Sequence, residues 1–342
     1  MAVYCRAFCG GLCGEGRHGR VPPPELMMSQ TPNPKRYSAV IPVYNSQKIV
    51  GDTIDRTAAF FEAHNLAYEI ILVNDGSPDN SWQVIRDKAQ SMPHVVAVNL
   101  LRNYGQHTAL YCGFQQSTGD YVITLDDDLQ NPPEEMLHLI EKAAEGHDLV
   151  FGRFRKKEHD SYRRAGSRLI GYMNEKIFDK PDDLVLTNFR IIRRDVVDRI
   201  CGYQTNYPYI PGLSLMFATN PANVWVEHQK RPSGTSNYNF IKILELVMRI
   251  LFNYSSYPLR FVSLAGMVIS LLSFLLGIYY LIRAIFIGTS VAGWATLIVL
   301  MSFFNGLSLL ILSMLGEYII RLLNQVSSTK SYYIKEIAHH HD

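Results

Sequence analysis

The chain is short of cysteine, of tryptophan and of any excess of one charge sign. Its 342 residues include 5 cysteines and 3 tryptophans, and its formal net charge is +2. Cys112 and Cys201 stand far apart in the sequence, so nothing in this part of the chain indicates a disulfide framework or an oxidising compartment. Nucleic-acid-binding proteins usually carry a basic excess, so we expect no nucleic-acid partner.

The three remaining cysteines, Cys5, Cys9 and Cys13, lie in a glycine-rich N-terminal stretch unlike the rest of the chain. Their spacing matches no common zinc motif, and the stretch lacks the apolar core of a signal peptide. We predict that residues 1–36 are a disordered or mis-started leader, with the functional chain beginning near Met27 or Met28.

Charge is absent from two long apolar runs, 261–282 and 294–315. Each is long enough for a helix to cross a hydrocarbon core, which needs about 20 apolar residues. We expect a transmembrane hairpin within residues 259–318, the alternative being two buried helices of a soluble core. Arginines and lysines flank its outer ends, which by the positive-inside rule places both termini and a tail of residues 319–342 in the cytoplasm.

Residues 239–258 mix apolar side chains with Lys242, Glu245 and Arg249 at helical spacing. The pattern predicts an amphipathic juxtamembrane helix that lies on the membrane surface. An ordinary amphipathic helix packed on the soluble domain is the alternative.

Between these regions, strand-like and helix-like segments alternate. Strands are predicted at 38–45, 68–77, 95–101, 120–128 and 147–153, with helical periodicity between them, which is typical of an α/β fold with a parallel sheet. Ligands of such sheets bind beyond the carboxyl ends of the strands. Asn45, Asp75, Asn103 and residues 126–128 all fall at those ends, so we expect one active site there.

Three consecutive aspartates follow the fourth predicted strand. Asn131 is a candidate N-cap and Pro132 a first helical residue, which puts the aspartates on a strand-to-helix turn. Asp126, Asp128 and the amide oxygen of Gln130 would form a hard-oxygen site that suits Mg²⁺ or Mn²⁺ bridged to phosphate. A solvated acidic turn is the alternative.

The motifs VIPVYN, VNDGS, NYGQH, GDYVITLDDDLQNPPE and GEYIIR occur in this order. Together they resemble the polyprenyl-phosphate glycosyltransferases of glycosyltransferase family 2, over roughly residues 38–335. The resemblance implies a GT-A Rossmann-like nucleotide-sugar domain, here residues 37–238, followed by the interface helix and the two membrane helices.

The resemblance also implies roles for particular residues. Pro42, Tyr44, Asn45, Asp75 and Asp126 would bind the nucleotide, and Asp126, Asp128 and Gln130 the metal. Asp126, Asp128, Arg153 and Arg231 would be catalytic. The acceptor phosphate or the sugar would contact Arg153, Arg164, Arg168, Asn188, Arg190, Arg231, Ser236 and Tyr238. The chain departs from the family pattern at Ser46, Asn74 and Asn237, where relatives often carry Glu, Asp and Lys.

For two of these regions the sequence leaves a structural alternative open. The arginines of residues 153–168 could be a solvated charge run, and Phe189 and Ile191 could belong to a core strand that leads into a helix cap. Asn188 and Arg190 are the better functional candidates in that segment.

The function implied is inverting transfer of a hexosyl unit, with UDP-glucose as the favoured donor, to a polyprenyl phosphate such as undecaprenyl phosphate. A phosphate nucleophile is already ionised near neutral pH and needs no strong base. The expected location is the inner (cell) membrane, multi-pass, with the catalytic domain in the cytoplasm, and a homo-oligomer such as a tetramer is plausible. A processive polysaccharide synthase and a catalytically inactive membrane scaffold are the alternatives. The synthase reading is weakened because no tryptophan lies in a Gln-x-x-Arg-Trp context.

Overall fold

The computed structural model describes residues 35–154, 161–203, 205, 207–229, 247–251, 253–255, 293–326 and 331–340, together with scattered residues between 261 and 286. The predicted leader, apart from its last two residues, lies outside them, as do Arg231, Ser236 and Tyr238. So do the side chains of Arg164 and Arg168.

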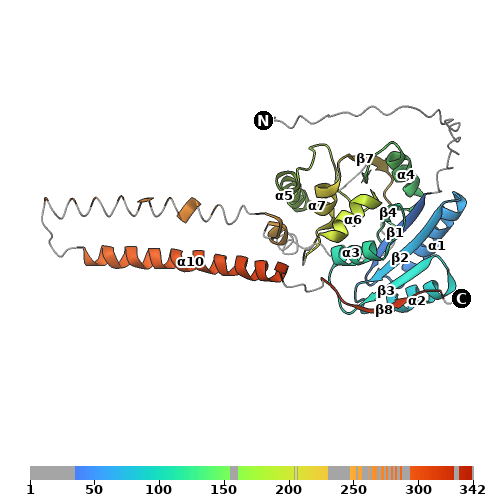
Figure 1. Ribbon diagram of the computed structural model, residues 1–342, viewed down its shortest axis with the longest axis horizontal. Helices are drawn as coiled ribbons and strands as arrows, with labels where there is room; N and C mark the ends of the chain where they lie inside the picture. The colour runs from blue at the N-terminus through green and yellow to red at the C-terminus, as the bar shows by residue number, and fades with distance from the viewer. Residues whose placement is uncertain are drawn as a thin grey trace, which may run out of the picture. The chain divides into compact units, whose positions relative to one another are not determined.

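In the described part of the chain, eight strands form one sheet in the order β7-β5-β6-β4-β1-β2-β3-β8 (Figure 1). The strands are β1 (Arg36–Val43), β2 (Ala67–Asn74), β3 (Val95–Leu100), β4 (Tyr121–Thr124), β5 (Leu149–Phe154), β6 (Arg190–Arg193), β7 (Pro221–Val226) and β8 (Ile334–Ala338). β1 pairs in parallel with β2 and β4, and β2 with β3. The predicted parallel α/β sheet is confirmed for these four strands.

The outer strands differ from the sequence-based picture. β6 runs antiparallel between β4 and β5, so β5 does not neighbour β4, and the core-strand alternative for this segment is confirmed. β8 pairs antiparallel with β3, although we expected only a tail after residue 318. The chain that follows the apolar runs therefore returns to the same sheet and adds the edge strand beside β3.

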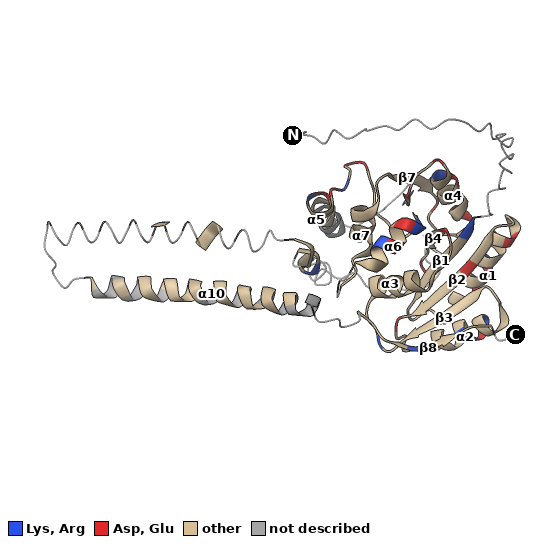
Figure 2. Cartoon of the chain, viewed as in Figure 1, with Lys and Arg blue, Asp and Glu red and all other residues tan. Residues whose placement is uncertain are grey.

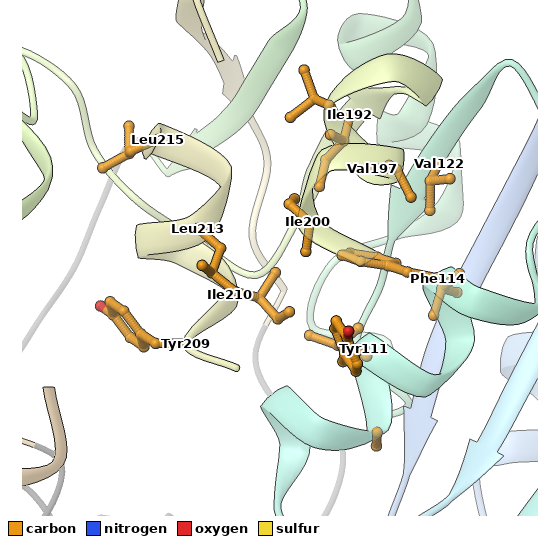
Figure 3. Packing of buried hydrophobic residues seen from close by; sticks show 14 of the residues in the cluster. Tyr111, Phe114, Val122, Ile192, Val197, Ile200, Tyr209, Ile210, Leu213 and Leu215 are labelled. Carbon is orange, nitrogen blue, oxygen red and sulfur yellow. The ribbon is translucent and has the colours of Figure 1, made fainter. Parts of the chain in front are cut away.

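Helices cover both faces of the sheet. They are α1 (Val50–Ala63), α2 (Ser81–Ser91), α3 (Gln106–Gln116), the 3₁₀ turn η1 (Pro133–Glu135), α4 (Met136–Ala144), α5 (Ser161–Phe178), α6 (Arg194–Gly202) and α7 (Ile210–Phe217). One core packs the sheet against α1, α2 and α4. The other packs it against α3, α6 and α7, and Figure 3 shows Phe114, Val197, Ile200 and Ile210 meeting there.

Strands buried on both faces read as continuous apolar runs. β1 and β2 each bury every residue but the first, which explains the sequences YSAVIPV and YEIILVN. α3 approaches β1 closely at Gly113, where an added Cβ would overlap the side chain of Val40. This contact fixes the depth at which α3, and its first residues, sit against the sheet.

Residues 247–251, 253 and 254 are helical, and they test the amphipathic segment in part. Val247 and Ile250 are buried in the core with α3, α6 and α7. The Tyr254 hydroxyl donates to the Tyr207 carbonyl and accepts from the Tyr209 amide. For these residues the structure matches the alternative, packing on the domain.

The helix α10 (Trp294–Val326) follows, and the described side chains on it are uncharged (Figure 2). Leu297, Met301 and Leu312 are each more than half exposed. Among the described residues, no helix meets the length and hydropathy required to cross a membrane.

Candidate active site

The order in which the chain adds strands to the sheet reverses between β1 and β4. From β1 the chain moves through β2 to β3 on one side, and returns to place β4 on the other. In sheets of this kind the crevice beyond the carboxyl ends of the two central strands binds the ligand. Tyr44 and Asn45 follow β1 at this crevice, and residues 126–128 lie just beyond the end of β4.

The three consecutive aspartates bind three separate sets of donors. Asp126 accepts from the side-chain amides of Gln106 (2.8 Å), Asn131 (3.2 Å) and Asn188 (3.5 Å). These donors come from α3, from the turn itself and from the residues before β6. The negative charge of Asp126 is thus held in place by neutral groups from three elements.

Asp127 instead joins the two sides of the crevice. Its carboxylate accepts from the Tyr44 amide (3.1 Å) and from the Ser46 hydroxyl, and its carbonyl accepts from the Thr53 hydroxyl (3.1 Å). Ser46, a departure from the family pattern, is therefore used here to bind the middle aspartate.

Asp128 is 7% exposed, and its carboxylate accepts from the backbone amide of Gln130 (3.1 Å). Gln130 lies on the same turn, and its backbone carbonyl accepts from the backbone amide of Gln229 (2.9 Å). The predicted N-cap at Asn131 is wrong. Asn131 is buried beside Asp126 and His228, and the helical residues begin at Pro133 without a side-chain cap.

At this site the negative charges of the three aspartates exceed the positive charge of the nearby arginine. Burial, together with the charges of Asp128 and Asp127, raises the pKa of Asp126 to about 7, against smaller opposing effects of Arg190 and of the hydrogen bond from Gln106. Burial also raises the pKa of Asp127 to about 6, although hydrogen bonds from Ser46 and Tyr44 oppose this. A cation at this edge would relieve the repulsion.

The donor set fits a divalent metal that is shared with a substrate. Within the described residues, no group of three or more His, Cys, Asp or Glu side chains could hold a metal ion by itself. Mg²⁺ and Mn²⁺ need no such group, because they commonly take one or two carboxylates and fill the remaining positions with substrate phosphate and water. Asp126, Asp128 and Gln130 would supply that kind of partial shell.

On the other side of the crevice, Asp75 is 3% exposed and holds a loop. Its two carboxylate oxygens accept from the backbone amides of Tyr104 (2.7 Å) and Gly105 (2.8 Å). Burial raises its pKa, and these two hydrogen bonds lower it by less. Gly76 has φ of +62°, and a Cβ there would meet the backbone of Arg102 and Asn103, so glycine is required for this approach.

The remaining nucleotide candidates lie along β1 and the turn after it. Pro42 is buried within β1, and Asn45 adopts φ of +57° and donates from its amide to the Ser77 hydroxyl (3.2 Å). Tyr44 is 48% exposed, so its ring is available to a ligand.

Two of the predicted acceptor arginines are described, and they lie in different environments. The Arg153 guanidinium, near the carboxyl end of β5, stacks over Trp225 at 4.6 Å. Arg190 is fully buried at the start of β6, where its Nε donates to the Thr124 hydroxyl (3.2 Å). Direct contact of Arg190 with a lipid phosphate at the surface is inconsistent with this burial.

Sequence reasoning assigned Gln106 no contact with the aspartates. Gln106 belongs to NYGQH, a polar motif that follows the third predicted strand. The position of this motif at the start of a helix, at the same sheet edge as the aspartates, was the available signal.

The chain is similar to glycosyltransferases. Residues 38–201 match the family model "Glycosyl transferase family 2". The chain is 37% identical over 314 residues to the undecaprenyl-phosphate 4-deoxy-4-formamido-L-arabinose transferase of Yersinia enterocolitica, covering 91% of this chain and 96% of that protein. The enzyme of the same name from Proteus mirabilis is 36% identical over 305 residues, covering 88% and 94%.

Among solved structures, the chain resembles glucosyl-3-phosphoglycerate synthase from Mycobacterium tuberculosis, in complex with Mn²⁺, UDP and phosphoglyceric acid. The TM-score is 0.49 at 17% identity, and the match covers 64% of this chain and 77% of that one.

The family model and the two enzymes that match nearly the whole chain identify a glycosyltransferase, and the strand order is that of a GT-A, Rossmann-like α/β domain. The chain belongs to glycosyltransferase family 2, as one of its polyprenyl-phosphate glycosyltransferases.

Proposed function

We propose that the chain transfers one sugar from a UDP-linked donor to a polyprenyl phosphate, with undecaprenyl phosphate as the first acceptor to test. The observation that carries the proposal is the acidic turn after β4. Its partly buried carboxylates are positioned by donors from several elements at the crevice where this fold binds ligands. The acceptor class is supported by the names of relatives that match nearly the whole chain.

The sugar has two candidates. The sequence favoured glucose, and the names of the relatives favour 4-deoxy-4-formamido-L-arabinose. The 37% identity to the Yersinia protein extends over almost the whole chain, so the second donor belongs in every assay beside the first.

On the donor side, Pro42, Tyr44, Asn45 and Asp75 would line the nucleotide site, with Asp126 between nucleotide and sugar. Asp126, Asp128 and Gln130 would hold Mg²⁺ or Mn²⁺. When bound, the ion would neutralise the charge that develops on the departing diphosphate. Gln106, Asn131 and Asn188 would keep the Asp126 carboxylate in one orientation.

On the acceptor side, a phosphate oxygen would attack the anomeric carbon from the face opposite the leaving group. The bond from that carbon to the nucleoside diphosphate breaks as the new one forms, and the configuration inverts. No proton must be removed, because the phosphate is already ionised. Arg153 is the described candidate to position it, since stacking on Trp225 limits its rotation. Arg164, Arg168, Arg231, Ser236 and Tyr238 complete the proposed acceptor set.

A membrane hairpin would bring this site to its lipid acceptor. The uncharged runs 261–282 and 294–315, and the exposed apolar side chains of α10, support an inner-membrane location with a cytoplasmic catalytic domain. The chain before the hairpin is packed into the domain through Ile250, and the chain after it through β8. Both ends of the hairpin would then belong to the same catalytic unit.

The test is a donor screen with the purified full chain, undecaprenyl phosphate and Mg²⁺ or Mn²⁺. Labelled UDP-glucose and UDP-4-deoxy-4-formamido-L-arabinose are the first donors. A lipid that carries a single sugar is expected. A polymer would support a processive synthase instead, and a lack of turnover with every donor would contradict the proposal and favour a scaffold.

A further inference from the structure

A buried arginine lies directly behind the aspartate cluster. Arg190 is 0% exposed, and its Nε donates to the Thr124 hydroxyl. Its two terminal nitrogens, Nη1 and Nη2, have no hydrogen-bond partner among the described residues. Buried donors are almost always satisfied, and unpaired charged ones carry a large desolvation penalty, so this guanidinium calls for a ligand or ordered water.

A second buried nitrogen without a partner lies in the same region. His107 as a residue is partly exposed, but its Nδ1 is buried and has no partner in the described part of the chain. Burial, with a smaller contribution from the positive charge of Arg190, lowers the pKa of His107 to about 3. His107 is therefore neutral at physiological pH and can donate or accept one hydrogen bond at Nδ1.

Aromatic rings lie beside both groups. The Arg190 guanidinium lies over the Phe151 ring at 5.7 Å, and the His107 ring meets Tyr209 edge-on at 5.3 Å. Flat apolar walls combined with a few fixed donors are typical of small-molecule sites, because the walls exclude water and the donors select an orientation.

The cluster is joined to the reaction site through its immediate neighbours in sequence. Gln106, next to His107, and Asn188, two residues before Arg190, both donate to the same oxygen of Asp126. β6 places Arg190 opposite Thr124, two residues before Asp126. A group bound between Arg190 and His107 would thus lie close to a carboxylate that we assign to the donor.

We propose that Arg190 and His107 form a subsite for the sugar of the nucleotide donor. The group bound there would be an uncharged hydrogen-bond acceptor, a hydroxyl or carbonyl oxygen of that sugar. The inference rests on the proposed function and names the part of the substrate that these residues would read. Two parallel N–H groups of a guanidinium match the lone pairs of one such oxygen, and His107 can bind a neighbouring group.

Charge argues against a phosphate in this position. The positive charge of Arg190 is already opposed by Asp126, and Asp127 and Asp128 add further negative charge nearby. A phosphate would bring excess negative charge into a buried region, whereas a neutral oxygen acceptor satisfies the donors without changing the charge balance. Of the two partners that the family resemblance implies for Arg190, the acceptor phosphate and the sugar, the charge balance favours the sugar.

The test compares binding of UDP with binding of a UDP-sugar by isothermal titration calorimetry, using the full chain in detergent with Mn²⁺. The sugar is whichever of UDP-glucose and UDP-4-deoxy-4-formamido-L-arabinose the wild-type protein transfers. Arg190→Lys keeps the charge and removes the forked donor pair. We expect affinity for the UDP-sugar to fall about tenfold to a hundredfold while affinity for UDP stays unchanged.

Two further variants make the result specific. His107→Asn should weaken UDP-sugar binding about threefold to tenfold, again without affecting UDP, and it gives an independent answer if Arg190→Lys unfolds. Arg193→Lys is the matched control, because Arg193 lies on the same strand, opposite Tyr121, and pairs with Asp195. It should bind both ligands like the wild type.

Equal weakening of UDP and UDP-sugar would overturn the inference, since Arg190 would then only support Asp126 and the fold. Unchanged binding of both ligands by Arg190→Lys and His107→Asn would overturn it as well. In either case wild-type transfer of sugar to lipid leaves the proposed function intact. A wild-type protein that binds UDP but neither binds nor transfers any UDP-sugar would instead reject the proposed function, and the subsite with it.

Discussion

At the scale of single residues, each aspartate of the acidic turn has its own donors, and the middle one spans the crevice. Asp127 binds the Tyr44 amide and the Ser46 hydroxyl, so it holds the turn after β1 against the turn after β4. The exposed ring of Tyr44 depends on this contact for its position.

Asp127→Ala should therefore loosen the donor site without removing a proposed metal ligand. Two hydrogen bonds to a carboxylate are lost, so KM for the donor should rise about tenfold or more. The Mn²⁺ concentration that gives half-maximal activity should stay unchanged. Steady-state kinetics at several donor and Mn²⁺ concentrations measure both, with the exposed Asp87→Ala as control. A change confined to the metal dependence would contradict this assignment of Asp127.

His107 gives a pH dependence of stability with a defined sign. Burial and the charge of Arg190 lower the pKa of His107 from 6.5 to about 3, so the unfolded chain binds a proton between those pH values that the folded chain does not. Stability from this group is complete above pH 6.5 and falls as the pH decreases, by at most about 1.4 kcal/mol per pH unit.

The unfolding midpoint of the wild type, followed by circular dichroism, should decrease more steeply between pH 6.5 and pH 5 than that of His107→Gln. The rings of Tyr207 and Tyr209 pack edge-on against the imidazole, and the pKa of Arg190, lowered by burial to about 10, keeps that group charged throughout this interval. Parallel curves for the two proteins would show that His107 is not held neutral.

The environment of Arg190 could be predicted from the sequence only in part. The family resemblance implied a contact of Arg190 with the acceptor phosphate or the sugar, but the side chain is buried rather than open to an acceptor at the surface. In a strand, Arg190 and Ile192 share a face, and Ile192 belongs to the core under α3 and α6. Strand alternation could have indicated the burial, but it could not have revealed the unpaired nitrogens, which depend on neighbours distant in sequence.

At the scale of elements, the four central strands and the helices between them followed from local patterns. Each strand is short, apolar and ended by a polar turn, and β1, β2 and β3 pair in the order in which they follow one another in the sequence. β6, which lies between β4 and β5, and β8, at the edge beside β3, were harder to place because antiparallel pairing with strands distant in sequence is not visible in periodicity. β8 also lies beyond the apolar runs, where the composition suggested only a tail.

The site depends on how closely the helix α3 packs against the sheet. A Cβ at Gly113 would overlap Val40, so Gly113→Ala should push the helix from the sheet and destabilise the fold by about 1–3 kcal/mol. Gln106 should then lose its contact with Asp126, and donor turnover should fall.

Gly171→Ala, on α5, is the matched control because an added Cβ meets nothing within 4 Å there. Denaturant unfolding and donor kinetics of both variants check the expectation. Equal stability and activity in the two proteins would show that the close packing of α3 is not required.

At the scale of the whole molecule, the catalytic sheet contains chain from both sides of the apolar runs. We expect the full-length protein to remain with membranes after carbonate and high-salt washes and to be released by detergent. The physical reason is that long uncharged segments leave the bilayer only at a large cost in exposed apolar surface. Release by carbonate alone would contradict the membrane hairpin without affecting the assignment of the catalytic site.

The central claim is that the carboxylates beyond β4 hold the donor diphosphate through a divalent ion and so drive transfer to a lipid phosphate. The most direct test is the rate of formation of lipid-linked sugar by wild type and Asp128→Asn, with undecaprenyl phosphate and saturating Mg²⁺ or Mn²⁺. Asp87→Asn serves as control. The account predicts that Asp128→Asn loses at least about a hundredfold in rate while remaining folded. A folded Asp128→Asn protein that transfers sugar at the wild-type rate would contradict it.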